Sequence, residues 1–452
     1  MTTQEGKQKL TLRCHTLTVE DVDEEWFEVY GLESEVTALR CISAIWSASQ
    51  PCVSLEERPN GPRTNLGREM TKIVIESFRH KSQNGDQSQD GRATAREVAR
   101  SLPPGCDLVE QRAQVLKKSM PNGISLSEAQ LNSVQAALQH RLTLIHGPPG
   151  TGKTTAAVSV LLAWRAFGDR ILCAADSNVA AENLHQNLAK WGVKSYRFAP
   201  AEMHQTGGAN AYQRMLAAQD AIGSFQIVVS TCASAGHELL RGHHFPRVLI
   251  DESTQSIEPS TLLPIINGCS HLVLIGDHLQ LPPTVISDDA RRLGLDRSLF
   301  ARLAEPVNEE NGARSIVEPL LLNEQRRMHA SIAEFPNHHF YDGLVKDKVG
   351  SRPPIPGVQF PQQDATRVLL VDCGAQGPTE EQFGTSWRNT VEVQAGVVES
   401  HVKDGFPGSN LLTCSVPKPG RHFETLLLMS YHLVLVQRAT FNQPWSRSRS
   451  WY

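Results

Sequence analysis

The chain has 452 residues, 40% of them hydrophobic and 20% charged, and a formal net charge of −4. A chain of this length predicts two or three domains and buries a sizeable core without help from disulfides or metals. The small negative charge excludes a strongly basic field over the whole molecule, so a nucleic-acid partner would be bound through local grooves and backbone amides.

Nine cysteines are scattered through the chain without a C-x-x-C pair. Because zinc sites normally need such closely spaced pairs, we expect no metal on cysteine and a reducing compartment. The first residues carry no apolar segment of the signal-peptide type, and the longest apolar stretch, residues 426–436, is too short to span a bilayer. These features predict a soluble protein without a membrane partner, in the cytoplasm or, as the alternative, in the nucleus.

The N-terminal part alternates apolar and polar residues in LTLRCHTLTVE and TKIVIESF, and such alternation is typical of short strands. We therefore expect a small β-rich module over residues 1–92, which ends in the polar linker 80–92 with the sequence HKSQNGDQSQDGR. A helical pattern interrupted by a Pro-Pro-Gly sequence predicts a helical connector over residues 93–125.

From residue 126 onward, short apolar runs recur, flanked by turn residues and separated by helical stretches. Continuous apolar strands that alternate with helices are typical of a parallel sheet covered on both faces. We therefore predict one α/β domain over residues 126–319. The runs are LTLIHG, RILCAAD, QIVVST, RVLIDE and HLVLIGD.

The sequence GPPGTGKTT follows the first of these strands and precedes the helical stretch TTAAVSVLLAW. Strand, glycine-rich loop and helix in this order are the context that a P-loop requires, and they disfavour a chance match. Backbone N–H groups of such a loop bind phosphate oxygens. We predict that the loop binds ATP, that Lys153 contacts the β- and γ-phosphates, and that Thr154 binds Mg²⁺. The predicted nucleotide-binding residues are Gly147, Pro148, Pro149, Gly150, Thr151, Gly152, Lys153, Thr154 and Thr155.

Two adjacent carboxylates, Asp251 and Glu252, follow the strand RVLI. The carboxyl ends of strands in an α/β sheet face the ligand crevice. Asp251 therefore suits a magnesium ligand, and Glu252 suits a general base for the attacking water. On its own such a pair is more often the start of a helix, where Asp is a favoured cap. Together with the P-loop, the catalytic interpretation is the stronger one.

Further polar residues follow other strands or precede the P-loop. Asp277 and Gln280 come at the end of HLVLIG, and we expect both beside the magnesium and the γ-phosphate. The paired arginines of LNEQRRMH fit an arginine finger or, with equal weight, a basic pair at a solvated helix end. Gln135 in LNSVQ fits an adenine contact or, more often for an isolated Gln, a surface residue.

The motifs GPPGTGKTT, DESTQ, GDHLQLPP and QRRMH occur in the order of superfamily 1 helicases of the up-frameshift type, and the chain resembles this family from about residue 131 to 392. The resemblance implies a RecA-like ATP-binding domain over 126–319 and a partial second RecA-like domain over 320–408. It also implies ATP and Mg²⁺ as cofactors and 5′-to-3′ movement on single-stranded RNA or DNA, with RNA favoured. By the same resemblance, Gln280 senses the γ-phosphate, Arg327 is the arginine finger, Gln135 contacts adenine, and Ser177, Asn178 and Thr231 contact the nucleic-acid backbone.

The chain also departs from this family. Arg326 stands where the family has Tyr, Ala330 stands where it has Pro, and none of the motifs expected after residue 392 is recognisable. We expect residues 409–452 to be a divergent tail. Two hypotheses follow: an ATP-dependent helicase or translocase, and a nucleotide-binding module with little or no motor activity because its second domain is incomplete. A small-molecule P-loop kinase is disfavoured because such kinases do not combine these motifs.

Overall fold

The computed structural model describes residues 2–4, 7–9, 35–49, 68–75, 91–102, 125–200, 211–309 and 312–350, and the strands between residues 368 and 437. Contacts within the chain define two units, residues 1–38 and 39–452. In the first unit, β1 (Thr2–Gln4) pairs with β2 (Lys7–Lys9). Most of the expected linker, residues 80–90, lies outside the described residues.

A seven-stranded sheet forms the centre of the second unit, in the order β11-β3-β8-β7-β4-β6-β5, and every neighbouring pair is parallel. Its five long strands coincide with the five apolar runs, which confirms the predicted parallel α/β sheet. Every residue of these five strands is buried because they lie between two layers of helices. The strands are β3 (Leu142–His146), β4 (Ile171–Ala175), β5 (Tyr196–Arg197), β6 (Ile227–Thr231), β7 (Arg247–Asp251), β8 (His271–Gly276) and β11 (Leu320–Leu321).

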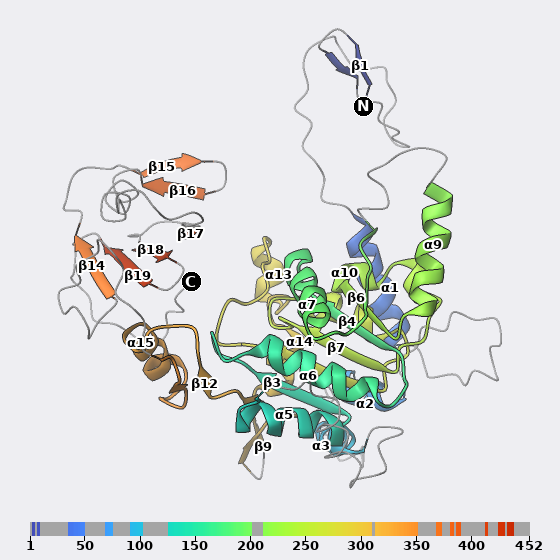
Figure 1. Ribbon diagram of the computed structural model, residues 1–452, viewed down its shortest axis with the longest axis horizontal. Coiled ribbons are helices and arrows are strands. Elements are labelled where there is room, and N and C mark those ends of the chain that lie inside the picture. The colour runs from blue at the N-terminus through green and yellow to red at the C-terminus, as the bar shows by residue number, and fades with distance from the viewer. Residues whose placement is uncertain are drawn as a thin grey trace. The chain divides into compact units, whose positions relative to one another are not determined.

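Alternate residues of each strand point to opposite faces of the sheet and enter two separate hydrophobic clusters. In β4, Leu172 and Ala174 join one cluster, whereas Cys173 and Ala175 join the other. The helices over the second face are α5 (Glu128–Gln139), α6 (Lys153–Arg165) and α7 (Asn178–Lys190) (Figure 1). The P-loop helix α6 packs against β4, β7 and β8 and contacts both α5 and α7, while α5 contacts β3.

The opposite face is covered in part by helices from the N-terminal region. The expected β-rich character of this region is wrong for two segments, which form α1 (Glu35–Ser49) and α2 (Arg68–Val74). The next described helix is α3 (Gly91–Arg100). Residues of all three helices belong to the same buried cluster as the sheet. From residue 39 onward, this region is part of the core of the α/β unit and not a separate module.

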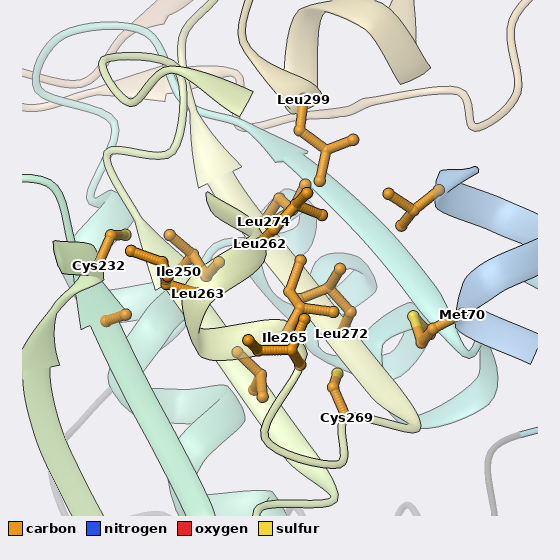
Figure 2. Packing of buried hydrophobic residues seen from close by; sticks show 14 of the residues in the cluster. Met70, Cys232, Ile250, Leu262, Leu263, Ile265, Cys269, Leu272, Leu274 and Leu299 are labelled. Atoms are coloured by element: carbon orange, nitrogen blue, oxygen red, sulfur yellow. The ribbon is translucent and has the colours of Figure 1, made fainter. Parts of the chain in front are cut away.

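The spacing of the buried residues explains why these segments are helical. Met70, Ile73 and Val74 are completely buried and recur at positions i, i+3 and i+4, which is the spacing of one helix face. Figure 2 shows Met70 directed toward the buried cluster that includes Leu272 of β8. The run IVI in this segment fits a strand as well as a helix. A helix places Met70 on the same buried face as Ile73 and Val74.

Other short helices complete the described part of this unit. They are α9 (Ala211–Ser224), α10 (Cys232–Ala235), α11 (Glu238–Arg241), α12 (Glu258–Ile265), α13 (Asp288–Arg292) and α14 (Leu299–Ala304), and the hairpin of β9 (Val307–Glu309) and β10 (Gly312–Arg314) follows. Among the helices that the structure describes, none has the length and apolar character needed to cross a membrane.

The chain after residue 319 begins inside the first sheet, because β11 pairs with β3. The boundary expected at residue 320 therefore cuts through this sheet. Farther on, β12 (Glu324–Gln325) pairs with β13 (Lys346–Asp347), and α15 (Ala330–Phe340) lies between them in sequence. Among the last strands, β15 (Glu380–Phe383) and β16 (Ser386–Asn389) form a hairpin. A four-stranded sheet contains β14 (Val368–Asp372), β17 (Leu412–Cys414), β18 (Glu424–Met429) and β19 (His432–Gln437). Its strand order is β14-β19-β18-β17.

Candidate functional site

The P-loop connects the end of β3 to the start of α6. Gly150 and Gly152 have φ angles of 75° and 82°, a left-handed conformation that favours glycine. A Cβ atom on Gly147 would lie 2.2 Å from Cγ of Lys153, so this position excludes any side chain. Gly147 N–H donates to the carbonyl of Gly276, 2.9 Å away, which ties the loop to the end of β8. The loop therefore has the tight turn and the helix N-terminus that bind phosphate.

Lys153 and Glu252 face each other across this loop. Nζ of Lys153 donates to the carbonyl of Gly147 at 3.1 Å and lies 3.4 Å from Oε1 of Glu252. Glu252 has a φ of 49°, which is uncommon for a residue other than glycine and marks local backbone strain. The turn after β7 thus directs the Glu252 carboxylate at the P-loop lysine.

Asp251 ends β7 and is buried beside this pair, with an exposed fraction of 6%. Burial and, to a lesser extent, the adjacent Glu252 carboxylate raise the pKa of Asp251 to about 6, although Lys153 and the backbone N–H of Glu252 act in the opposite direction. The described hydrogen bond to its carboxylate comes from the backbone N–H of Glu252, at 3.0 Å. A buried carboxylate with this environment fits a hard cation, because Mg²⁺ prefers oxygen ligands. Thr154, in the first turn of α6, supplies a partly exposed hydroxyl.

Other P-loop residues hold the shape of the loop. The Thr151 hydroxyl is buried and donates to the carbonyl of Pro148 at 2.7 Å. Pro149 is half-buried, and Thr155 lies in the first turn of α6, where its carbonyl accepts from Ser159 Oγ. The Thr151 N–H and hydroxyl both donate to the Pro148 carbonyl, and these two hydrogen bonds hold the turn of the loop.

Asp277 follows β8 and is the acceptor of four hydrogen bonds. Its Oδ1 accepts from His146 Nε2 at 2.9 Å and from the N–H of Leu279 at 3.1 Å. Its Oδ2 accepts from Gln280 Nε2 at 2.5 Å and from Tyr341 Oη at 2.7 Å. We expected Asp277 beside the magnesium and the γ-phosphate; its carboxylate contacts His146, which precedes the P-loop, but all four of its acceptor positions are taken by protein donors.

The pKa of Asp277 agrees with this description. Burial alone would raise that pKa, but the hydrogen bonds from His146, Gln280 and Tyr341 outweigh it and lower the pKa below its ordinary value. The carboxylate is therefore ionised and acts only as an acceptor. His146 ends the apolar run LTLIHG, but neither it nor Tyr341 was assigned a role from the sequence, because no local pattern links either residue to Asp277.

The QRRMH segment lies directly against the P-loop. The N–H of Arg326 donates to the carbonyl of Gly150 at 2.9 Å, and a Cβ atom on Gly150 would lie 2.6 Å from Cβ of Arg327. The buried amide of Gln325 holds this turn, since its oxygen accepts from the N–H groups of Arg327 and Met328. Both arginine side chains are exposed. The structure thus brings Arg327 to the nucleotide side of the sheet, as the finger interpretation requires.

Comparisons with known proteins agree with this geometry. The AAA domain family matches residues 125–210 and 202–288, and a second AAA domain family matches residues 295–404. The regulator of nonsense transcripts 1 homolog of Arabidopsis thaliana is 28% identical over 354 residues, which cover 67% of this chain and 27% of that protein. ATP-dependent helicase NAM7 of Saccharomyces cerevisiae is 33% identical over 314 residues, which cover 61% of this chain and 31% of that protein.

DNA-binding protein SMUBP-2 of Mesocricetus auratus is 29% identical over 350 residues, which cover 62% of this chain and 34% of that protein. The chain belongs to the superfamily 1 helicases of the up-frameshift type. This chain spans about a third or less of the length of these relatives. Both AAA matches fall on the residues that form the site described above.

Gln130, and not Gln135, is the glutamine of α5 whose side chain contacts the P-loop. Gln130 is buried, and its Nε2 donates to the carbonyls of Thr151 and Gly152 at 3.2 and 3.4 Å. Its Oε1 accepts from the N–H of Ser127, which completes a capping box at the start of α5. Gln135 lies on the exposed side of α5. Gln130 was missed from the sequence, although the S-x-x-Q pattern of Ser127 and Gln130 before an apolar run could have drawn attention to it.

We expect Gln130→Ala to weaken nucleotide binding about tenfold, because two neutral hydrogen bonds to the P-loop are lost. Loss of the capping box lowers stability by about 1 kcal/mol, which corresponds to a fall of roughly 2–4 °C in the thermal midpoint. Gln135→Ala is the matched control, and we expect a change in affinity of less than about twofold. Titration with a fluorescent ATP analogue measures the nucleotide affinity of both variants. A larger loss of affinity in Gln135→Ala than in Gln130→Ala would restore Gln135 as the residue that contacts adenine.

The residues expected to contact nucleic acid lie at the same edge of the sheet but differ in exposure. Ser177 and Asn178 are exposed at the start of α7, where Ser177 Oγ accepts from the N–H of Ala180, and Asn178 Oδ1 accepts from Arg197. Thr231 is buried, and its hydroxyl caps α10. In this geometry Thr231 caps a helix, whereas Ser177 and Asn178 are accessible to a partner.

The start of α7 is joined to the catalytic turn after β7. Ser256 lies four residues after Glu252, and its buried hydroxyl donates to Oδ1 of Asp176 at 2.5 Å. Asp176 immediately precedes Ser177. This hydrogen bond links the segment after Glu252 to the segment that presents Ser177 and Asn178.

Proposed function

We propose that the chain is an ATP-dependent helicase or translocase that acts on single-stranded nucleic acid, with RNA favoured over DNA. The observation that carries the proposal is the meeting of three motifs at one place: Lys153 of the P-loop faces Glu252, and the backbone of Arg326 contacts Gly150. The names of the relatives, which include two helicases or regulators of transcripts and a DNA-binding protein, support nucleic acid as the partner.

The proposed roles follow from position. Lys153 and the P-loop N–H groups bind the β- and γ-phosphates, Glu252 accepts the proton of the attacking water, and Gln280 and Arg327 contact the γ-phosphate. Thr154 and Asp251 hold Mg²⁺, which when bound neutralises phosphate charge. Ser177 and Asn178 contact the nucleic-acid backbone.

We also propose a revised domain arrangement. The ATP-binding domain takes in the helices between residues 39 and 102 and the sheet through β11, and the second, partial domain begins after residue 321 and extends to about residue 408. Residues 409–452 stay a divergent tail in sequence, although its strands β17, β18 and β19 share a sheet with β14 of the second domain. The cytoplasm is the proposed location. Buried contacts of α2 and the pairing of β11 with β3 support the two shifted boundaries.

The test is steady-state ATP hydrolysis with poly-U RNA, with single-stranded DNA and with neither, alongside binding of a fluorescent ATP analogue. Lys153→Ala serves as the variant without a phosphate-binding lysine. Stimulation by nucleic acid that Lys153→Ala abolishes supports the motor. Binding of the analogue without Lys153-dependent hydrolysis contradicts the motor and supports a nucleotide-binding module with an incomplete second domain.

The raised pKa of Asp251 predicts that Mg²⁺-dependent nucleotide binding weakens as the pH falls below about 6. A protonated carboxyl must lose its proton before it binds the cation, so affinity falls by up to about tenfold per pH unit below that value. Above that pH the ionised, buried carboxylate destabilises the fold, and a bound cation offsets this effect.

The measurement is the affinity for a fluorescent ATP analogue between pH 5 and 8, with Mg²⁺ and with a chelator. Asp251→Asn is the control, because it removes the titrating carboxyl while the phosphates of the nucleotide still titrate. Parallel pH profiles for the wild type and the variant would contradict the assignment of Asp251 as a metal ligand.

A further inference from the structure

The carboxylate of Asp277 receives donors from three parts of the chain that are distant in sequence. His146 is the last residue of β3 and directly precedes the P-loop, Gln280 lies in the loop after β8, and Tyr341 follows α15. Asp277, His146 and Tyr341 are buried, with exposed fractions of 1%, 8% and 7%. An ionised carboxylate has about four acceptor positions, and four donors fill them here.

The two oxygens of this carboxylate have different partners. Oδ1 is held by His146, the last residue of β3, and by the backbone N–H of Leu279 in the loop after β8. Oδ2 is shared by the Gln280 amide and the Tyr341 hydroxyl. Because Oδ1 is fixed, the carboxylate cannot rotate when one donor leaves Oδ2. The strength of the Tyr341 hydrogen bond therefore depends on where the Gln280 side chain points.

We propose that Asp277 passes the state of the nucleotide site from Gln280 to Tyr341 and α15, with His146 and Tyr341 as positioning residues. This inference rests on the proposed role of Gln280 toward the γ-phosphate. When Gln280 turns to a phosphate, Oδ2 keeps Tyr341 as a donor, and that hydrogen bond to a charged acceptor becomes stronger. When Gln280 returns, it competes for the same oxygen, and Tyr341 is held less tightly.

The Tyr341 hydrogen bond affects the segment that runs from β12 through α15 to β13. Tyr341 closes α15, whose first residues follow the turn that carries Arg327. Asn337 of the same helix binds the backbone N–H and carbonyl of Val345 through its side chain, and this contact joins the helix to the chain that enters β13. Tighter binding of Tyr341 therefore stabilises the whole turn that presents Arg327 to the P-loop.

The test compares amide hydrogen exchange of residues 330–341 with ADP bound and with a non-hydrolysable ATP analogue bound, in the full chain. We expect about tenfold slower exchange with the analogue, the effect of one hydrogen bond to a charged group. In Tyr341→Phe this difference falls below twofold, and kcat falls about tenfold while KM changes less than twofold. His146→Leu gives the same result, and His146→Gln restores at least half of the difference because its amide keeps a donor.

Tyr196→Phe, the same hydroxyl deletion in β5 at the far edge of the sheet, is the matched control and leaves exchange and kcat unchanged. The inference is overturned if Tyr341→Phe and His146→Leu both bind nucleotide and keep the wild-type exchange difference. If the wild type binds nucleotide without nucleic-acid-stimulated hydrolysis, the proposed motor fails, and the exchange measurement still decides the inference. If no nucleotide binds, both are overturned.

Discussion

Replacing Glu252 by Gln is expected to lower kcat for ATP hydrolysis by roughly 10²–10⁴-fold, the contribution of a general base. The side chain keeps its size, and the turn with φ of 49° keeps its direction, but the amide cannot accept a proton at neutral pH. Nucleotide affinity should stay the same or increase, because Lys153 loses the carboxylate that now lies 3.4 Å from its Nζ. Hydrolysis assays and analogue titration on the same samples separate the two effects.

Gln255→Ala is the control for this variant. Gln255 Nε2 donates to the other oxygen of Glu252 at 3.4 Å, so its loss disturbs the neighbourhood without removing the base. We expect its kcat to stay within about threefold of the wild type, since an exposed hydrogen bond contributes little. If Glu252→Gln retains more than a tenth of the wild-type kcat, the proton acceptor is another group, and the adjacent Asp251 becomes the first candidate.

The central sheet was predictable from the sequence because its strands are buried on both faces. Such strands read as continuous apolar runs, and their flanking turns mark their ends, as in RVLI before Asp251. The helix α2 was missed because the short IVI run fits both a strand and a helix face. The burial of Met70 together with Ile73 and Val74 decides for the helix, and this burial depends on tertiary packing that the local sequence does not show.

The candidate site was predictable where its residues belong to contiguous motifs. Lys153 and Glu252 meet as expected, because parallel strands place their carboxyl ends at one edge. The contacts of His146 and Tyr341 with Asp277 join residues that are 131 and 64 positions apart, and no local pattern encodes such pairs. Gln130 is an intermediate case. Its capping-box pattern is visible in the sequence, but its contact with the P-loop is not.

The largest expected effect on stability comes from Glu258→Ala. Glu258 starts α12 and receives hydrogen bonds from the Arg302 guanidinium of α14, at 2.9 and 3.2 Å from Nε and 2.7 Å from Nη2. Nη2 also donates to the carbonyl of Val74 at 2.9 Å, so the arginine joins α2 to the helices over the sheet. The exposed fractions of the Arg302 and Glu258 side chains are 8% and 18%. Removal of the carboxylate leaves a buried charge without its anion.

That loss should lower the free energy of unfolding by about 3–5 kcal/mol, a fall of roughly 6–20 °C in the thermal midpoint. The matched control is Asp288→Ala, because the Asp288–Arg291 pair has side chains that are 72% and 50% exposed. Exposed pairs contribute about 0–1 kcal/mol, so this variant should melt within a few degrees of the wild type. Circular dichroism melts of both variants make the comparison.

The double variant Glu258→Ala/Arg302→Met separates the charge from the packing. Met fills much of the volume of Arg302 and carries no charge, so the double variant should recover most of the stability lost in Glu258→Ala. If the double variant melts as low as the single one, the loss comes from the packing of α12 and α14 and not from an unpaired guanidinium. If Glu258→Ala melts no lower than Asp288→Ala, the contact with Val74 alone satisfies Arg302, and α2 holds its place on the sheet through burial of Met70, Ile73 and Val74.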